Sequence, residues 1–214
     1  MLAAAWQYLV AHPAAFAQAL GVHVALSASA LLLAALIAIP AAIAASRRPT
    51  LAVGITQSAN IGRTLPSLAV LALVMPILGT GFAPSLFALT LLALPPIVQN
   101  TLAGLRSVEP DVVDAARGMG MTAGEVMRRI ELPIAVPAVF AGLRTAAVQV
   151  ISGAVLAAFI GGGGLGDFIT AGIAMMALPQ LLVGAIPVTL LALGVDAAFG
   201  LAQRRLTSAG MRAA

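Results

Sequence analysis

The chain has 214 residues, of which 61% are hydrophobic and only 8% charged, and its mean hydropathy is +1.08. A soluble domain usually carries about a quarter of charged residues, so this composition excludes an ordinary soluble domain and indicates an all-α polytopic membrane protein. The net charge is +4 with arginine as the only strongly basic residue, and the absence of cysteine excludes disulfides, thiolate catalysis and cysteine-ligated metals. His12 and His23 have no carboxylates near them in the sequence, so we expect neither a metal nor another cofactor.

The N-terminal residues 1–20 contain no Lys or Arg and therefore lack the basic start of a secretory signal. Trp6, Tyr8 and Phe16 give this stretch the aromatic character of membrane–water interfaces. We expect an interfacial helix on the outer membrane surface, with a poorly ordered terminus as the alternative.

Five segments are long and apolar enough for transmembrane helices, which need roughly 20 mostly apolar residues. They are the ranges 22–45, 51–78, 83–105, 138–160 and 178–201. Two of them carry no charge, and the other three carry one each, namely Arg63, Arg144 and Asp196. Because lipid offers no hydrogen-bond partner to an open backbone, every span is expected to be helical.

The arginines predict the orientation of these spans. Two follow the first span, four lie between the third and fourth spans, and three follow the fifth, whereas the other connections contain none. With five spans all three basic stretches fall on one side, which the positive-inside rule places in the cytoplasm. We therefore expect the N-terminus outside, a membrane domain over 21–203 and a cytoplasmic tail over 204–214.

Polar and proline residues inside the spans are candidates for a translocation path or gate, because broken helices and intramembrane polar groups often line such paths. Each residue alone can equally bend a helix or bond across helices. The candidates are Asn60, Arg63, Thr64, Pro66, Asn100, Gln149 and Ser152. Arg63 is the most unusual, since a charge in mid-span is costly and usually functional, although a snorkelling side chain is the alternative.

The stretch 109–137, between the third and fourth spans, holds five of the seven acidic residues and predicts two short helices. Pro110 suits the first turn of a helix, and Asp111 and Asp114 favour its positive end. Gly118 and Gly120 supply the backbone freedom to end that helix and turn.

Thr122 and Glu125 have the spacing of a capping box, so a second helix is expected to start there and to end near the Arg128–Arg129 pair. Pro133 and Pro137 are then expected to redirect the chain into the fourth span. A DNA-binding helix-turn-helix is excluded, because the element is tethered between membrane spans and has too few cations on one face. Its apolar side chains instead predict a docking surface for a partner protein.

The run 161–166 fits the pattern G-x-G-x-x-G, but it follows a membrane span and has neither a βαβ unit nor the end of a P-loop. We therefore expect no nucleotide binding here. The glycines instead predict a tight outer turn or re-entrant piece, with a plain flexible loop as the alternative. The residues concerned are Gly161, Gly163, Gly164 and Gly166.

One motif carries a family resemblance. Asp114, Ala115 and Ala116 are followed by Gly118 and Gly120, and then by Ile130, Leu132 and Pro133. This pattern resembles the Glu-Ala-Ala loop of binding-protein-dependent ABC importer permeases, with Asp114 in place of the usual glutamate. The resemblance implies a type I importer fold with five core spans, in a bacterial inner membrane. It also implies a separate ATPase that receives the loop, an extracytoplasmic substrate-binding protein, and a second permease that is either another copy or a related chain.

Three further runs, 60–69, 94–101 and 159–166, resemble the permeases of osmoprotectant importers, which carry glycine betaine, carnitine, choline or proline. Methionine importer permeases are the second possibility, and a channel or structural membrane protein outside this class is a weaker third. An intramembrane enzyme is excluded, because the spans show no nucleophile with a base and no metal ligands. A cation at Arg63 would favour a solute with a carboxylate. Because aromatic residues are few, selectivity is expected to reside in the separate binding protein.

Overall fold

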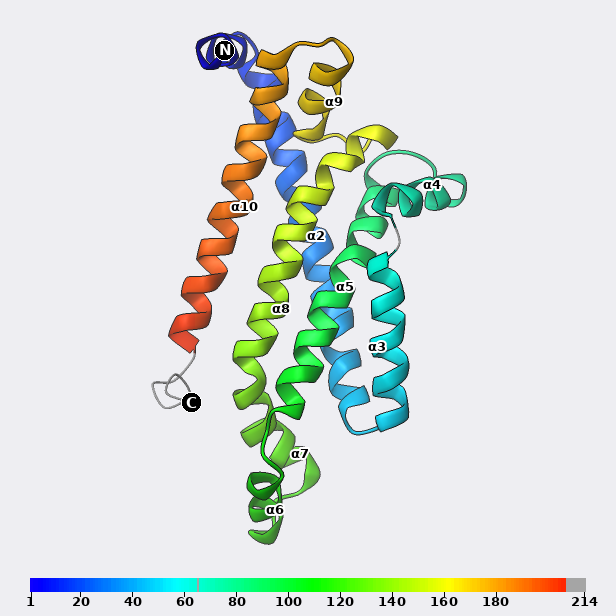
Figure 1. Cartoon of the computed structure of the whole chain (residues 1–214), viewed down its shortest axis with the longest axis vertical. Helices are drawn as coiled ribbons and strands as arrows, with labels where there is room; N and C mark the ends of the chain where they lie inside the picture. The colour runs from blue at the N-terminus through cyan, green and yellow to red at the C-terminus, as the bar shows by residue number, and fades with distance from the viewer. Residues whose placement is uncertain (65, 207–214) are drawn as a thin grey trace.

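The computed structural model describes residues 1–64 and 66–206, except for the side chains of residues 49, 63 and 206. All regular elements in this part of the chain are helical, as the composition predicts. In chain order they are α1 (Leu2–Ala11), α2 (Pro13–Ser46), α3 (Pro49–Thr64), α4 (Ser67–Leu78), α5 (Phe82–Arg106), α6 (Pro110–Gly118), α7 (Ala123–Val126), the π-helical turn η1 (Met127–Glu131), α8 (Leu132–Gly153), the 3₁₀ helix η2 (Ala154–Ile160), α9 (Gly166–Ala174) and α10 (Leu178–Leu206). Figure 1 shows the long helices running side by side, with α6 and α7 beyond one end.

Four continuous helical segments in the described residues are long and apolar enough to cross a membrane. They are Pro13–Ser46, Phe82–Arg106, Ala123–Ile160 and Leu178–Arg205. A bent pair, Thr50–Gly62 with Ser67–Leu78, makes five if it counts as one span. The number of helical segments thus agrees with the five predicted spans, whereas several of their boundaries differ.

The second predicted span, 51–78, is broken rather than continuous. Its two halves are inclined by 97° to each other. Pro66 has extended backbone (φ −60°, ψ 125°) and starts α4 as its N-cap residue. A proline cannot donate the backbone hydrogen bond that a continuing helix needs, which explains why the helix stops here. Figure 1 shows α3 upright at the right-hand edge of the bundle, and α4 above it, lying roughly level and pointing away from the bundle.

The N-terminal prediction also needs correction. The first helix ends at Ala11 instead of near residue 20, and residues 13–20 already belong to α2. Pro13 occupies the first turn of α2, where its missing N–H costs nothing. With 34 residues α2 is about 51 Å long, well beyond the roughly 30 Å of a hydrocarbon core. An upright helix of this length extends beyond the hydrocarbon core.

The centre of the bundle is formed by α2, α5 and α8, and alanines let these helices approach closely. Ala30, Ala34, Ala38 and Ala42 form a fully buried stripe on α2, at a spacing of four residues. Glycine has the same role between α5 and α8. A Cβ on Gly142 would lie 2.8 Å from the carbonyl oxygen of Pro96 and 2.8 Å from the Cβ of Asn100. Small residues of this kind are typical of packing between membrane helices.

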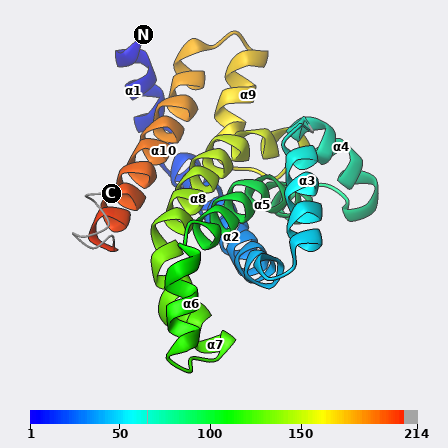
Figure 2. The same cartoon turned by 60° about the horizontal axis from the view of Figure 1, so that its bottom comes forward.

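The outer helices surround this centre. α10 packs on α8, α9 and α1, whereas α3 packs on α5 and α2, and Figures 1 and 2 show α10 and α3 on opposite sides of the bundle. A second apolar cluster joins α1, α9 and α10 through Ala5, Phe168 and Val183. The helices thus form one continuous bundle, with α6 and α7 projecting from one end (Figure 2).

Candidate docking loop and translocation path

The first half of the 109–137 loop is helix α6. Pro110 begins it and Asp111 lies in its first turn, as predicted. The helix ends at Gly118, and Gly120 follows with a φ of +83°, a left-handed conformation that favours glycine. The amide of Met121 donates to the carbonyl of Ala116, which closes the turn and satisfies the end of the helix.

The second half starts with the predicted capping box. The amide of Thr122 donates to Glu125 Oε2 at 2.9 Å, and the amide of Glu125 donates back to Thr122 Oγ1 at 3.4 Å. The Thr122 hydroxyl adds a third bond to the same carboxylate at 2.8 Å. The bonds from the Thr122 amide and then from its hydroxyl lower the pKa of Glu125 below its usual value.

The end of this second helix differs from the prediction. α7 does not stop near Arg128 and Arg129 but continues through η1 into α8, as one helical segment from residue 123 to residue 160. In η1 the amide of Leu132 donates to the carbonyl of Met127, five residues back. This π-type widening lies directly before Pro133, which has no N–H, and lets the helix continue past it. The two prolines therefore do not redirect the chain into a new helix at 138.

The eight motif residues divide into a packed set and an exposed set. Ala116 is buried, while Ile130 and Leu132 are half-buried, and Leu132 packs against the cluster of Leu105, Met127 and Ala135. The exposed members are Asp114, Ala115, Gly118, Gly120 and Pro133. A Cβ on Gly118 would meet nothing within 4 Å. Leu132 thus anchors the end of the loop on the bundle, and four of the five exposed members lie on α6 or directly after it.

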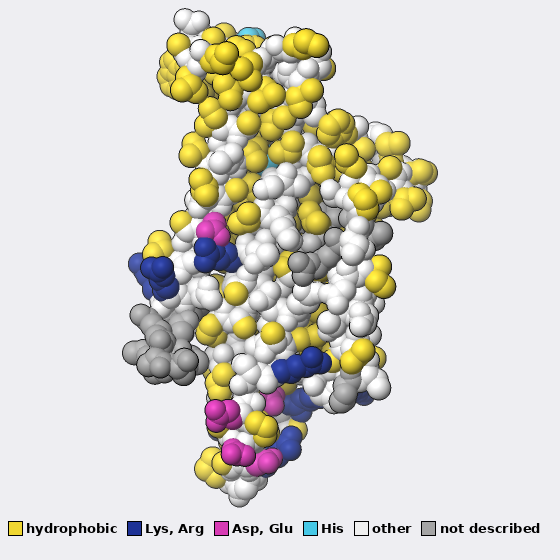
Figure 3. Space-filling model, viewed as in Figure 1, with side chains coloured by type: hydrophobic (Ala, Val, Ile, Leu, Met, Phe, Trp, Pro, Cys, Tyr) yellow, Lys and Arg dark blue, Asp and Glu magenta, His cyan; other side chains and the backbone are white. Residues whose placement is uncertain are grey.

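Figure 3 shows the charges on the visible face gathered over the half of the molecule that carries this loop, while apolar side chains dominate the other half. At the tip of the loop Met119 is 76% exposed, and Val112 on α6 is 40% exposed. Exposed apolar side chains beside charged ones are typical of a protein-binding surface.

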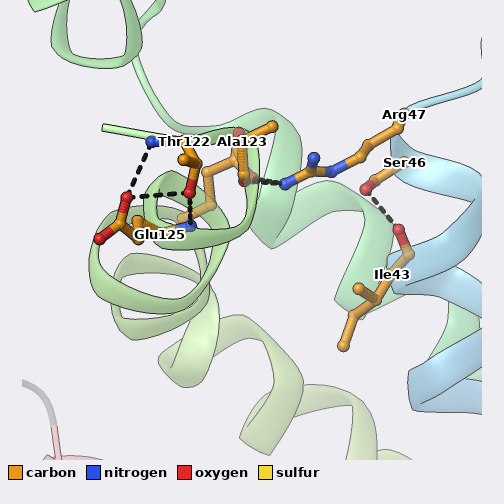
Figure 4. Close-up of polar contacts among 7 residues, drawn as sticks. Ile43, Ser46, Arg47, Thr122, Ala123 and Glu125 are labelled. Atoms are coloured by element: carbon orange, nitrogen blue, oxygen red, sulfur yellow. Dashed lines mark hydrogen bonds and ion pairs between the residues drawn. The ribbon is translucent and has the colours of Figure 1, made fainter. Parts of the chain in front are cut away.

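Arg47 is a functional candidate that the sequence analysis used only for orientation. It caps the C-terminus of α2, and its Nη2 donates to the carbonyl of Ala123, the first residue of α7. The same nitrogen lies 4.0 Å from Glu131 Oε2. Figure 4 shows Arg47 reaching from the end of α2 to the start of the capping-box helix. No local pattern could have predicted this contact, because it joins positions 76 residues apart.

The predicted path residues fall on two sides of the molecule. On α3, Asn60 Oδ1 accepts a 2.7 Å bond from Gln99 Nε2 of α5, and the Thr64 hydroxyl donates to the Ile61 carbonyl. Asn100 donates to the Pro96 carbonyl at 2.8 Å, within α5. These last two bonds are local helix contacts and carry no specific indication of a path. The side chain of Arg63 lies outside the described residues.

Two cavities lie among these helices, and the second of them is lined by a path candidate. One, of about 320 Å³, is apolar and lies between α2, α3, α4 and α5, with Ser58 and Ser67 among its lining. The other, of about 420 Å³, lies between α8 and α10 and is lined by Gln149, Arg144 and Asp196. Ser152 is exposed on α8, one turn beyond Gln149. In the single chain Gln149 thus lines the second cavity, whereas Asn60 is bonded to Gln99 on α5 and lines neither.

The glycine-rich run forms a tight turn, as predicted. Gly161, Gly163 and Gly164 have φ values of +73°, +74° and +97°. A Cβ on Gly166 would collide with the carbonyl of Val155. The turn is connected to the N-terminus of α5 because the amide of Gly81, the N-cap residue of α5, donates to the Ile160 carbonyl at 2.7 Å.

The structure is an all-α bundle in which a helical loop projects between the third and fourth of the candidate membrane spans. Residues 14–208 match the family described as the inner membrane component of binding-protein-dependent transport systems, and the chain belongs to that family. It is therefore a permease subunit of an ABC transporter, and ATP hydrolysis is the task of a separate subunit.

Similar proteins of known role support this assignment. The chain is 42% identical over 190 residues to the choline transport system permease protein OpuBB of Bacillus subtilis, covering 89% of this chain and 88% of that protein. It is 42% identical over 192 residues to the carnitine transport permease protein OpuCB of Listeria monocytogenes, covering 90% of this chain and 88% of that protein. It is 41% identical over 187 residues to the osmoprotectant import permease protein OsmY of Salmonella typhimurium, covering 86% and 79%.

Solved structures confirm the fold. An inward-facing structure of the MetNI methionine ABC transporter superposes with a TM-score of 0.79 at 19% identity, covering 91% of this chain and 97% of that one. An amino acid ABC transporter with histidines gives a TM-score of 0.75 at 20% identity, covering 93% of this chain and 97% of that one. At these identities the likeness establishes the shared fold alone, which is the fold that the loop motif implied.

Proposed function

We propose that this permease imports a small osmoprotectant, such as glycine betaine, carnitine, choline or proline. The observation that carries the proposal is the identity of about 40% along nearly the whole chain to permeases named for choline, carnitine and osmoprotectants. The likeness to a methionine transporter rests on 19% identity and concerns the fold, so it gives methionine little support.

The 109–137 loop is the proposed docking site for the ATPase. Its exposed set, with Met119 at the tip, offers an apolar surface, and open space surrounds Gly118. Leu132, at the end of the loop, packs on Leu105 of α5 and Ala135 of α8, and α7 continues into α8 as one helical segment, so a push on the loop would move the long helices rather than only a flexible connection. This arrangement suits the transmission of an ATP-driven movement into the bundle.

The basic end of the bundle, which carries Arg47, Arg106 and the 109–137 loop, is proposed to face the cytoplasm. The N-terminus and the glycine turn would then face outward, towards a substrate-binding protein. In a single chain Gln149 lines a cavity that Asn60 does not line, so we propose that a second permease, either a copy or a related chain, completes the path.

Uptake by the reconstituted importer tests the substrate. The permease, its ATPase and its binding protein are placed in proteoliposomes, and ATP-driven uptake of labelled glycine betaine, choline, carnitine, proline and methionine is compared. We expect at least one osmoprotectant to accumulate only when ATP is present. Accumulation of methionine alone would contradict the proposal, and uptake that needs no ATP would instead indicate a channel.

A further inference from the structure

An ion pair connects α8 to α10 inside the predicted spans. Arg144 donates from Nε to Asp196 Oδ1 and from Nη2 to Asp196 Oδ2, both at 2.6 Å. This parallel two-bond geometry is the strongest form of an arginine–carboxylate contact. A further bond joins the two helices near the basic end, where Gln203 Nε2 donates to the carbonyl of Pro137 at 3.0 Å. Holding α10 against α8 is therefore one evident role of the pair.

The pair is nevertheless open to its surroundings. The side chains of Arg144 and Asp196 are 41% and 36% exposed, and both line the cavity of about 420 Å³. Nη1 of Arg144 takes no part in the two bonds to Asp196, and Gly200 of α10 lies beside the guanidinium, where an added Cβ would be in ordinary contact with Nη1 at 3.4 Å. Asp196 also retains lone pairs on both oxygens. Each member can thus bind a further group without losing its partner.

The pair lies inside the two predicted spans, towards their basic ends. Asp196 stands five residues before the predicted end of its span at 201, a rise of about 7.5 Å, and Arg144 stands six residues after the predicted start of its span at 138, a rise of about 9 Å. A half-exposed charge at such a depth is costly against lipid, and such residues almost always face a bundle interior or a water-filled cavity. On α8, Thr145, Gln149 and Ser152 follow at spacings of four and three residues, so they extend one polar face along the helix.

We propose that Arg144 and Asp196 form a binding site for a zwitterionic solute within the permease. The solute carboxylate binds the open edge of the Arg144 guanidinium, and its cationic group lies beside the Asp196 carboxylate. Two opposite charges held side by side complement a solute that carries both. A cation without a carboxylate, such as choline, engages only Asp196. The inference rests on the proposed function and names the chemical class of the solute at this point of the path.

Equilibrium binding tests this site without the selectivity of a separate binding protein. Labelled glycine betaine and choline are added to the permease–ATPase complex in nanodiscs. The variants compared are Arg144→Gln, Asp196→Asn and the charge-swapped double variant Arg144→Asp/Asp196→Arg, with Arg205→Gln as the control outside the cavity. The swapped variant keeps an ion pair between α8 and α10 but reverses the positions of the charges.

Loss of a hydrogen bond to a charged group predicts that Arg144→Gln weakens glycine betaine binding about 10-fold or more and choline binding much less. Asp196→Asn weakens both, and the swapped variant, which again holds two opposite charges side by side, binds glycine betaine more tightly than either single variant. Equal binding of glycine betaine by Arg144→Gln and the unaltered complex, or no binding by the unaltered complex, would overturn the site. ATP-driven uptake by the complete importer is measured in parallel, so failure of the proposed function is recognised separately.

Discussion

The contact of Arg47 with the 109–137 loop makes a quantitative prediction. Removal of this side chain by Arg47→Ala deletes the hydrogen bond to Ala123 and the ion pair with Glu131. The side chains of the ion pair are 43% and 20% exposed, so the pair contributes less than about 1 kcal/mol, and the hydrogen bond contributes about 1 kcal/mol. A total of about 1–2 kcal/mol corresponds to a 5–30-fold decrease in the population of loops held against α2.

Because the chain contains no cysteine, this loosening can be measured with two introduced labels. Cysteines at the exposed positions Thr50 and Gly124 carry spin labels, and the distance between them is recorded in the assembled transporter. We expect a narrow distribution in the parent protein, a broad one in Arg47→Ala, and weaker coupling of ATP hydrolysis to uptake. Arg48→Ala is the matched control, since it removes an adjacent exposed arginine of the same charge. Equal distributions and equal coupling in the two variants would refute the role assigned to Arg47.

Two further predictions concern the packing of the bundle and the order of the loop. Gly142→Val should lower the free energy of unfolding by about 1–3 kcal/mol in detergent, because its side chain would collide with Pro96 and Asn100. Gly194→Val is the control and should have little effect, since a Cβ there meets nothing within 4 Å. Equal melting temperatures of the two variants would contradict this packing. The hydrogen bonds that lower the pKa of Glu125 stabilise its ionised form, so their contribution is present above the unfolded pKa of about 4.3 and is lost as the pH falls through the lower folded value. A spin label at position 124 should therefore become more mobile in the parent protein as the pH falls through the lowered pKa of Glu125. It should show no such change in Thr122→Ala, which loses about 1 kcal/mol of capping and is already mobile at neutral pH. A pH response that Thr122→Ala retains would exclude the capping box as its cause.

Local features of this molecule could be predicted from the sequence because a few adjacent residues determine them. Hydropathy indicates where the spans lie, and the spacing of Thr122 and Glu125 predicts the capping box that the structure contains. Gly120 has the left-handed backbone that a turn between two helices requires. The glycines of 161–166 likewise form the expected tight turn.

The prolines show where local reasoning is insufficient. By residue type Pro66 is expected inside one span and Pro133 is expected to redirect the chain, but in the structure the helix breaks at Pro66 and continues past Pro133. The outcome depends on whether the neighbouring turn can rearrange its hydrogen bonds, as η1 does by widening before Pro133. Residue type alone does not determine this.

The contacts that tie the candidate sites together could not be predicted at all. Arg144 meets Asp196 across 52 positions, and Arg47 meets Ala123 across 76. In the sequence, Arg144 and Asp196 are two single charges in separate predicted spans. Only the packing of α8 against α10 converts them into a pair.

Gly118→Val tests most directly whether the 109–137 loop couples this permease to an ATPase. Its added side chain would meet open space within the chain, so insertion and thermal stability should equal those of the parent protein. The side chain would project from the surface proposed for docking, so co-purification of the ATPase and ATP-driven uptake of glycine betaine should both fall at least about 10-fold. A stable Gly118→Val permease that retains its ATPase and imports at the parent rate would contradict the account.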